Sequence, residues 1–248
     1  MFIVVKHMMD EKKEEGFVSN TSGRKLLGTS NLLGLLKWNT PTVYNGWEQI
    51  TTNPHYGRTC FNLEPIQDHS PDMGPMVGYA VTVKINPGTI EVVEEQAALG
   101  NKGMWSFMAT LPTDLPKIVV VQDLSKPVIY GSMWGEVNAT FFKSVGAVGC
   151  ITDGGVRDLD EMKNIGFHAM SRGVTISHSY GVVPVEVDVP ITAFGVDIRP
   201  GIREHLSTIP MFSYLHIQGV SKKWCSVYFA NISATKHWIF KSFFSPEN

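Results

Sequence analysis

The order of the elements is decided by residues 131–158, which read GSMWGEVNATFFKSVGAVGCITDGGVRD. A glycine-bounded loop, 131–135, stands directly before a helical stretch that we expect over about 136–145. Gly146 suits the left-handed conformation that often closes a helix. The apolar run 147–152 that follows it is typical of a buried strand. The local order is therefore loop, helix, strand.

A glycine turn and further strands extend this pattern on both sides. Asp-Gly-Gly at 153–155 predicts a tight turn into a second helix over about 157–164, closed by Gly166. Upstream, large residues alternate with small ones over 77–83, which is the period of a strand, and the run 118–121 is apolar throughout. Because strands and helices interleave, the sequence predicts an α/β or α+β domain.

Other segments carry weaker local signals. Leucines within 32–36, followed by residues 40–43 with a proline near the start, predict a helix or a helix pair. Residues 90–100 are typical of a helix whose three glutamates form a solvated face. Alternating valines over 185–189 indicate a strand at a sheet edge. Residues 1–35 mix charged and small polar residues without a period and predict a loosely ordered extension.

Composition excludes several classes of protein. Lysine and arginine number 21 against 23 acidic residues, so the electrostatic footprint of a nucleic-acid binder is absent. Cys60, Cys150 and Cys225 form no CxxC pair, which fits a reducing compartment, and we expect a cytoplasmic protein. No apolar run has the length of a secretory signal or of a membrane span, so no membrane partner is expected.

Several common active sites are also absent from the sequence. Residues 131–135 have the two glycines of a GxSxG elbow but Met133 where the nucleophile would stand. No phosphate-binding GxxxxGK[ST] or GxGxxG loop occurs, and the eight histidines form no HExxH motif. An imidazole-held metal and a nucleotide cradle are therefore not supported.

The loop 131–135 (Gly131, Ser132, Met133, Trp134 and Gly135) is the best candidate for an anion-binding site. It stands at a helix start, where free backbone N–H groups and the positive end of the helix dipole favour a carboxylate or phosphate. Glu136, which opens that helix, would repel an anion unless a cation lay between them. Oxygen ligands suit Mg²⁺ or Mn²⁺, so a divalent metal is expected here.

The second glycine turn delivers Arg157 and Asp158 to the next helix start. Arginine offers a fork of donors that matches a carboxylate or an enolate oxygen, and the aspartate offers an oxygen ligand for the same metal. These parts would bind a small 2-oxo acid and stabilise its enolate. From the residues alone a second interpretation stays open, in which the same stretch is only a tight turn, a helix cap and a surface ion pair.

These motifs together resemble those of the RraA-like family, which includes 4-hydroxy-4-methyl-2-oxoglutarate aldolases and oxaloacetate decarboxylases. The resemblance rests on 131–136, then twenty residues, then Arg157-Asp158, with 153–156 leading into the pair. It extends over about 36–201, with further matches at 40–43, 77–83, 172–175 and 196–201.

The resemblance implies a layered α/β/β/α domain of the swivelling type with mixed sheets, assembled as homotrimers or hexamers. It also implies that Asp158 and Glu136 hold the metal, that Arg157 contacts the 2-oxo acid, and that backbone amides of 131–136 receive its carboxylate. The implied activity is a metal-dependent lyase, a class II pyruvate aldolase or oxaloacetate decarboxylase. The alternative is a non-enzymatic regulator of ribonuclease activity, although such members are expected to lack the acid that Glu136 supplies here.

The likeness ends after Gly201. Residues 202–248 become rich in aromatic side chains, and the change is abrupt enough to suggest a shifted reading frame or a retained intron. Loss of a terminal strand would expose a sheet edge and apolar surface, so we expect this segment to be partly folded or aggregation-prone. An inactive product is thus a third interpretation. The predicted domains are 1–35, 36–201 and 202–248.

Overall fold

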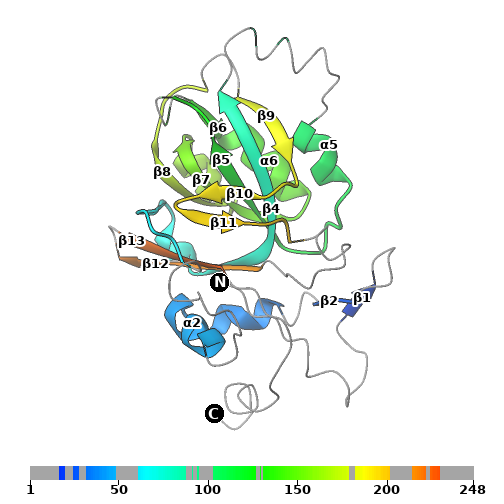
Figure 1. The fold of residues 1–248 in the computed structure, drawn as a ribbon, viewed down its shortest axis with the longest axis vertical. Helices are drawn as coiled ribbons and strands as arrows, with labels where there is room; N and C mark the ends of the chain where they lie inside the picture. Colours follow the sequence, from blue (N-terminus) through cyan, green and yellow to red (C-terminus); the bar gives the residue numbers. More distant parts are fainter. Residues whose placement is uncertain are drawn as a thin grey trace.

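The computed structural model describes residues 17–19, 25–27, 32–48, 61–87, 91, 94, 103–126, 129, 131–178, 182–201, 214–221 and 224–229. Within this part, one mixed sheet dominates, with the strand order β13-β12-β4-β5-β7-β8-β3, and β6 and β9 pair with β7 and β4 beside that path (Figure 1). The strands of this sheet are β3 (Gln67–Asp68), β4 (Met76–Pro87), β5 (Lys117–Asp123), β6 (Ser132–Trp134), β7 (Ala147–Val156), β8 (His168–Val174), β9 (Val182–Val187), β12 (Tyr214–Ser221) and β13 (Trp224–Phe229).

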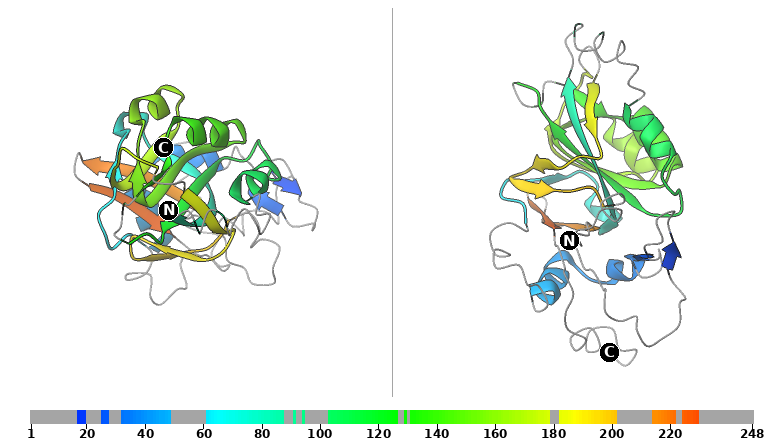
Figure 2. Two further views of the ribbon diagram at one scale, coloured as in Figure 1. Left: turned by 90° about the horizontal axis from the view of Figure 1, so that it is seen from above. Right: turned by 45° about the vertical axis from the view of Figure 1, so that its right-hand side comes forward.

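Helices cover one face of this sheet and a small hairpin covers the other (Figure 2). On the first face lie α5 (Gly103–Ala109), α6 (Glu136–Ser144) and α7 (Leu159–Asn164). The opposite face carries β10 (Ile191–Ala193) and β11 (Val196–Ile198), which pair antiparallel. Further helical elements in the described part are η1 (Gly34–Lys37), α2 (Thr40–Glu48) and η2 (Pro71–Met73). The α/β class with mixed sheets, predicted from the sequence, is confirmed.

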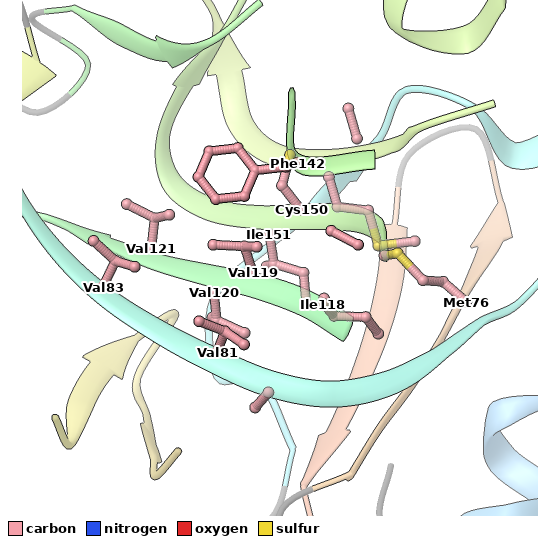
Figure 3. Packing of buried hydrophobic residues seen from close by; sticks show 14 of the residues in the cluster. Met76, Val81, Val83, Ile118, Val119, Val120, Val121, Phe142, Cys150 and Ile151 are labelled. Atoms are coloured by element: carbon pink, nitrogen blue, oxygen red, sulfur yellow. The ribbon is translucent and has the colours of Figure 1, made fainter. Parts of the chain in front are cut away.

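The core forms where the central strands run parallel. β4 pairs with β5, β5 with β7 and β7 with β8, all in parallel. Ile118–Val121 is fully buried, and these side chains pack against Val81, Val83, Phe142 and Ile151 (Figure 3). The predicted strands over 77–83, 118–121 and 147–152 are therefore confirmed, and each is buried on both faces because helices and a hairpin flank the sheet.

The glycines that close α6 and α7 behave as predicted. Gly146 has φ +90°, and a Cβ there would lie 2.3 Å from the Thr113 carbonyl oxygen, so only glycine fits. Gly166, with φ +70°, closes α7. That helix starts two residues later than expected, at Leu159, because Asp158 adopts the left-handed region at φ 53° and so stands outside it.

The predicted turn at Asp153-Gly154-Gly155 is wrong. β7 runs through these residues to Val156, and Gly155 and Val156 still pair with β8. Close neighbours explain the glycines instead: a Cβ on Gly154 would lie 2.3 Å from Asp123 Oδ2, and one on Gly155 would lie 2.8 Å from Ile129 and Thr175. The glycines allow close approach here rather than a reversal of the chain.

The other expected elements fall close to their predicted places. α2 begins at Thr40 with Pro41 in its first turn, as predicted. β9 pairs with β4 alone among the described strands, which fits a sheet edge, but it ends before Asp188, whose φ is 60°. Of the helix expected over 90–100, only Glu91 and Glu94 are described; both are helical and exposed. The rest of that prediction lies outside the described residues.

The two ends of the chain contribute more strands than expected. β1 (Phe17–Ser19) and β2 (Lys25–Leu27) form a hairpin inside the segment predicted to be loosely ordered. β12 pairs antiparallel with β4 along Met76–Tyr79, so the edge expected to lie open is covered there. The other residues of 1–31 and 202–248 lie outside the described part, and the partial folding of the C-terminal segment stays a prediction. No helix in the described part is both long and apolar enough to cross a bilayer.

Two neighbouring aspartates, the buried Asp123 and the half-buried Asp153, join β5 to β7. Asp153 accepts a hydrogen bond from the Asp123 backbone N–H at 2.6 Å, and the Arg172 Nε–H donates to the Asp153 carbonyl oxygen at 2.8 Å. Burial raises the pKa of Asp153 to about 6, and the nearby Asp123 carboxylate adds to that rise. Asp123 Oδ2 is itself buried and has no hydrogen-bond partner.

We predict that Asp153→Asn changes how stability depends on pH. Because its folded-state pKa is about 6 against 3.8 for the unfolded group, the folded protein holds this proton more tightly between these values, and stability falls as pH rises through the window. Relative to wild type, the variant should therefore gain up to about 3 kcal/mol in free energy of unfolding between pH 4 and 7. Urea unfolding of both proteins across this range measures the difference; a constant difference would contradict the prediction.

Candidate functional site

Two segments that are far apart in the sequence meet where α6 begins. The Glu136 backbone N–H donates to Asp158 Oδ2 at 3.0 Å, and Arg157 Nε lies 3.7 Å from the same oxygen. Asp158 makes no side-chain capping bond to its own helix, α7. Its carboxylate therefore caps α6, where the positive end of the helix dipole stabilises a negative charge.

Backbone pairing holds this junction in place. The predicted loop 131–135 contains a short strand, β6, which runs parallel to β7 and pairs Ser132 with Gly155. The Arg157 N–H donates to the Trp134 carbonyl oxygen at 3.0 Å. The Ser132 hydroxyl donates to the carbonyl oxygens of Trp134 at 2.6 Å and Gly155 at 3.0 Å. The start of α6 and the Arg157-Asp158 pair are thus fixed by one sheet.

Gly135 is the point of closest approach. A Cβ built there would lie 2.5 Å from Asp158 Oδ2 and 3.1 Å from Arg157 Nε. Its φ of −161° is open to any residue, so the requirement for glycine comes from these two side chains and not from the backbone. Only a residue without a side chain lets the carboxylate reach the Glu136 N–H.

A pocket of about 190 Å³ opens beside this junction. It is lined by Ser132, Met133, Gly135, Val137, Asn138, Arg157 and His178. Its volume is below the usual range for drug-sized ligands, so it suits a molecule of a few heavy atoms. Arg157 is the one permanently charged side chain among these lining residues, which favours a small anion.

The residues predicted to bind substrate divide into two groups. Ser132, Met133, Gly135 and Arg157 line the pocket, whereas Gly131 and Trp134 do not. The Trp134 side chain is fully buried, with ring centroids 5.2 Å from Phe142 and 5.3 Å from Phe167. Trp134 contributes to the core, and only its backbone takes part in the junction.

Three of the six backbone amides proposed for the anion, those of residues 131–136, already donate to acceptors within the chain. The N–H groups of Ser132, Trp134 and Glu136 donate to Ser177 O, Ser132 Oγ and Asp158 Oδ2. The N–H groups of Val137 and Asn138, in the first turn of α6, have no acceptor inside the helix, and both residues line the pocket. An anion in the pocket would therefore meet the N–H groups of Val137 and Asn138 rather than the three bonded N–H groups of the predicted loop.

Three lining residues were missed by the sequence analysis. Val137 and Asn138 lie in the first turn of α6, so the helix start after Gly135 was the signal that could have found them. Asn138 is held firmly, since its Nδ2 donates to the Met133 carbonyl oxygen at 2.6 Å and its Oδ1 accepts from Trp105 Nε1 at 3.2 Å. His178 follows β8, and only strand pairing brings it to this edge of the sheet.

The two acidic residues Glu136 and Asp158 meet at the junction through the Glu136 backbone N–H, and neither of them lines the pocket. Asp158 uses one oxygen for the Glu136 N–H and keeps a side chain that is 32% exposed, and Glu136 is exposed at the helix start. In the described part of the chain, no three histidine, cysteine or acidic residues gather as a metal-holding group. This donor set does not fit a zinc site, but Mg²⁺ commonly binds one or two carboxylates and keeps several waters.

The model of one family, described as Aldolase/RraA, matches residues 40–202, which include every residue that lines the pocket. The chain belongs to the RraA-like family. This result confirms the resemblance drawn from the spacing of Glu136 and Arg157-Asp158. Membership alone leaves the activity open, because the family resemblance covers both lyases and regulators.

One individual relative matches this chain over a much shorter stretch than the family model does. A protein from Halalkalibacterium halodurans, named "Putative 4-hydroxy-4-methyl-2-oxoglutarate aldolase", is 39% identical over 59 residues. These residues cover 24% of this chain and 28% of that protein, so the alignment spans less than a third of the relative's length.

Two solved structures share the fold. A protein described under "novel cellulases from microbes associated with the gut ecosystem" has a TM-score of 0.57 at 15% identity, over 81% of this chain and 76% of that one. RraAS2 of Streptomyces coelicolor, described as an unusual member of the RNase ES inhibitor RraA protein family, has a TM-score of 0.55 at 18% identity, over 81% of this chain and 84% of that one. At such identities the likeness shows the fold alone.

We predict that Gly135→Ala disrupts the site without unfolding the protein. The new methyl group would meet Asp158 Oδ2 and Arg157 Nε, so both side chains must move and the Asp158 cap on α6 must be lost. The backbone tolerates alanine at this φ, and loss of one cap costs about 1 kcal/mol.

Thermal unfolding and a crystal structure of the variant test this prediction. The control is Gly34→Ala, where a Cβ would meet nothing within 4 Å. A variant in which the Glu136 N–H still bonds to Asp158 would show that Gly135 is not the constraint described here.

Proposed function

We propose that this chain is a divalent-metal-dependent lyase that acts on small 2-oxo acids, by retro-aldol cleavage of 4-hydroxy-2-oxo acids, by decarboxylation of oxaloacetate, or by both. The proposal depends most on one observation: Arg157 lines a small pocket while Asp158, beside it, reaches the start of α6. A cation, an arginine and a helix start would then surround one small anion.

Arg157 is the group that suits the substrate best. Its guanidinium presents parallel N–H donors that match a carboxylate or an enolate oxygen, and its charge persists at all physiological pH values. The first-turn N–H groups of Val137 and Asn138 offer further donors for the same anion. Because the pocket is small, a substrate with a short carbon chain fills it.

These groups favour chemistry that ends in an enolate. When the bond between C3 and the departing carbon breaks, its electron pair moves onto the 2-oxo group, and negative charge develops on that oxygen. Arg157 stabilises this charge, since a donor aimed at developing charge acts more strongly in the transition state than in the ground state. A divalent cation held by Asp158 and Glu136 would act as a Lewis acid on the same 2-oxo group.

We expect the purified protein to release pyruvate from oxaloacetate in the presence of Mg²⁺ or Mn²⁺ and to lose this activity in EDTA. Arg157→Ala should lower turnover on the order of 10²-fold, because it removes a donor to developing charge. Lys163→Ala is the matched control, since this exposed lysine pairs with Asp72 and lies outside the pocket. Equal rates with and without EDTA would contradict the metal-dependent mechanism.

The two alternatives from the sequence predict a different outcome. A regulator of ribonuclease activity, or an inactive product of an altered gene, would fold and assemble without releasing pyruvate at any metal concentration. The acid at Glu136 argues against the regulator, because non-enzymatic members are expected to lack it. A cytoplasmic location and assembly as a trimer or hexamer remain parts of this proposal.

A further inference from the structure

The proposed reaction needs a proton donor, and neither Arg157 nor the backbone N–H groups at the start of α6 supply one. An enolate becomes pyruvate only when its C3 carbon takes up a proton. Arg157 stays protonated, so it stabilises charge but does not transfer a proton. The donor has to be another group in the same pocket, and this inference rests on the proposed function.

The pocket offers few candidates for this role. Met133 and Val137 carry no exchangeable proton, and the Asn138 amide is bonded to Met133 and Trp105. The Ser132 hydroxyl donates to the carbonyl oxygens of Trp134 and Gly155 and accepts from the Trp134 N–H, so it is committed to holding β6. Among the residues that line the pocket, His178 remains, and imidazole is a common general acid and base in catalysis.

The backbone around His178 is anchored to the strands that carry the rest of the site. The Thr175 N–H donates to the Val156 carbonyl oxygen at 2.9 Å, just before Arg157. The Ser177 carbonyl oxygen accepts from the Ser132 N–H, also at 2.9 Å. One bond ties the segment to β7 and the other ties it to β6. The backbone that leads into His178 is therefore held beside the pocket by the same strands that place Arg157.

His178 is also accessible to water. It lines the pocket and is exposed to solvent, so water can reach it between turnovers. Ile176, two residues earlier, is 94% exposed and does not line the pocket, so it serves as a neighbouring position without a role in the site.

We propose that His178 is the catalytic acid that protonates the enolate. After carbon dioxide leaves oxaloacetate, the electron pair of the broken bond forms the C2–C3 double bond of the enolate. The imidazolium N–H proton then moves to C3, the C2 carbonyl re-forms, and neutral imidazole regains a proton from water. By microscopic reversibility, the same imidazole removes a methyl proton from pyruvate in the reverse direction.

Exchange of the pyruvate methyl protons in D₂O tests this role, measured by proton NMR with Mg²⁺ present. We expect His178→Gln to slow exchange on the order of 10²-fold or more, within the usual contribution of general acid–base catalysis. Carbon dioxide release from oxaloacetate should fall less, because water can protonate an enolate that leaves the site. The control Ile176→Gln should keep both rates.

A second variant separates chemistry from structure. His178→Gly should lose exchange in the same way and regain it in proportion to added imidazole, which a purely structural role would not produce. Exchange by His178→Gln at the wild-type rate, or a glycine variant that imidazole does not rescue, would overturn the assignment of His178. A wild-type protein that neither exchanges pyruvate nor decarboxylates oxaloacetate would instead overturn the proposed function.

Discussion

The hydrogen bond from the Glu136 N–H to the Asp158 carboxylate is the constraint on which the site depends. It joins the start of α6 to the residue before α7, across a separation of twenty-one intervening residues. The bond forms because Gly135 leaves room for it, and it places the Arg157 guanidinium beside the pocket at the same time. Pairing of β6 with β7 brings the two segments together, and the missing side chain at Gly135 leaves room for the Asp158 carboxylate at the start of α6.

The parallel core explains why the site lies where it does. β7 and β8 run in the same direction, so their carboxyl ends meet at one edge of the sheet, which is the usual place for a ligand in open α/β sheets. β7 ends just before Arg157, and His178 lies shortly after the end of β8. Asp123, at the end of β5, and Asp153, within β7, link these two strands through the bond from the Asp123 N–H to the Asp153 carboxylate.

Local sequence patterns correctly predicted the elements whose formation depends mainly on residues close to one another in the sequence. The apolar run of β5, the alternation in β4 and the helix-closing Gly146 and Gly166 all follow from residue type and spacing, and the structure confirms them. The glycines at 154 and 155 misled the prediction because their local signal is that of a turn. Their actual cause is the closeness of Asp123, Ile129 and Thr175, which no local pattern records.

The same limit applies to the candidate site. Arg157, Asp158 and Glu136 could be selected because chemistry and spacing mark them, and the structure brings the Asp158 carboxylate to the Glu136 backbone. Trp134 stood inside the motif, yet its side chain lies in the core between Phe142 and Phe167. His178 stood outside the motif and lines the pocket, because strand pairing is decided by tertiary contacts and not by neighbours in the sequence.

Calorimetric titration with Mg²⁺ tests the central claim most directly, because it detects the proposed cation site without requiring turnover. We expect one saturable site in the wild-type protein, with affinity greatly weakened in Asp158→Asn and reduced in Glu136→Gln, while Asp72→Asn, which changes the exposed partner of Lys163, binds as wild type. Binding of equal affinity in the wild-type protein and in Asp158→Asn would contradict the account.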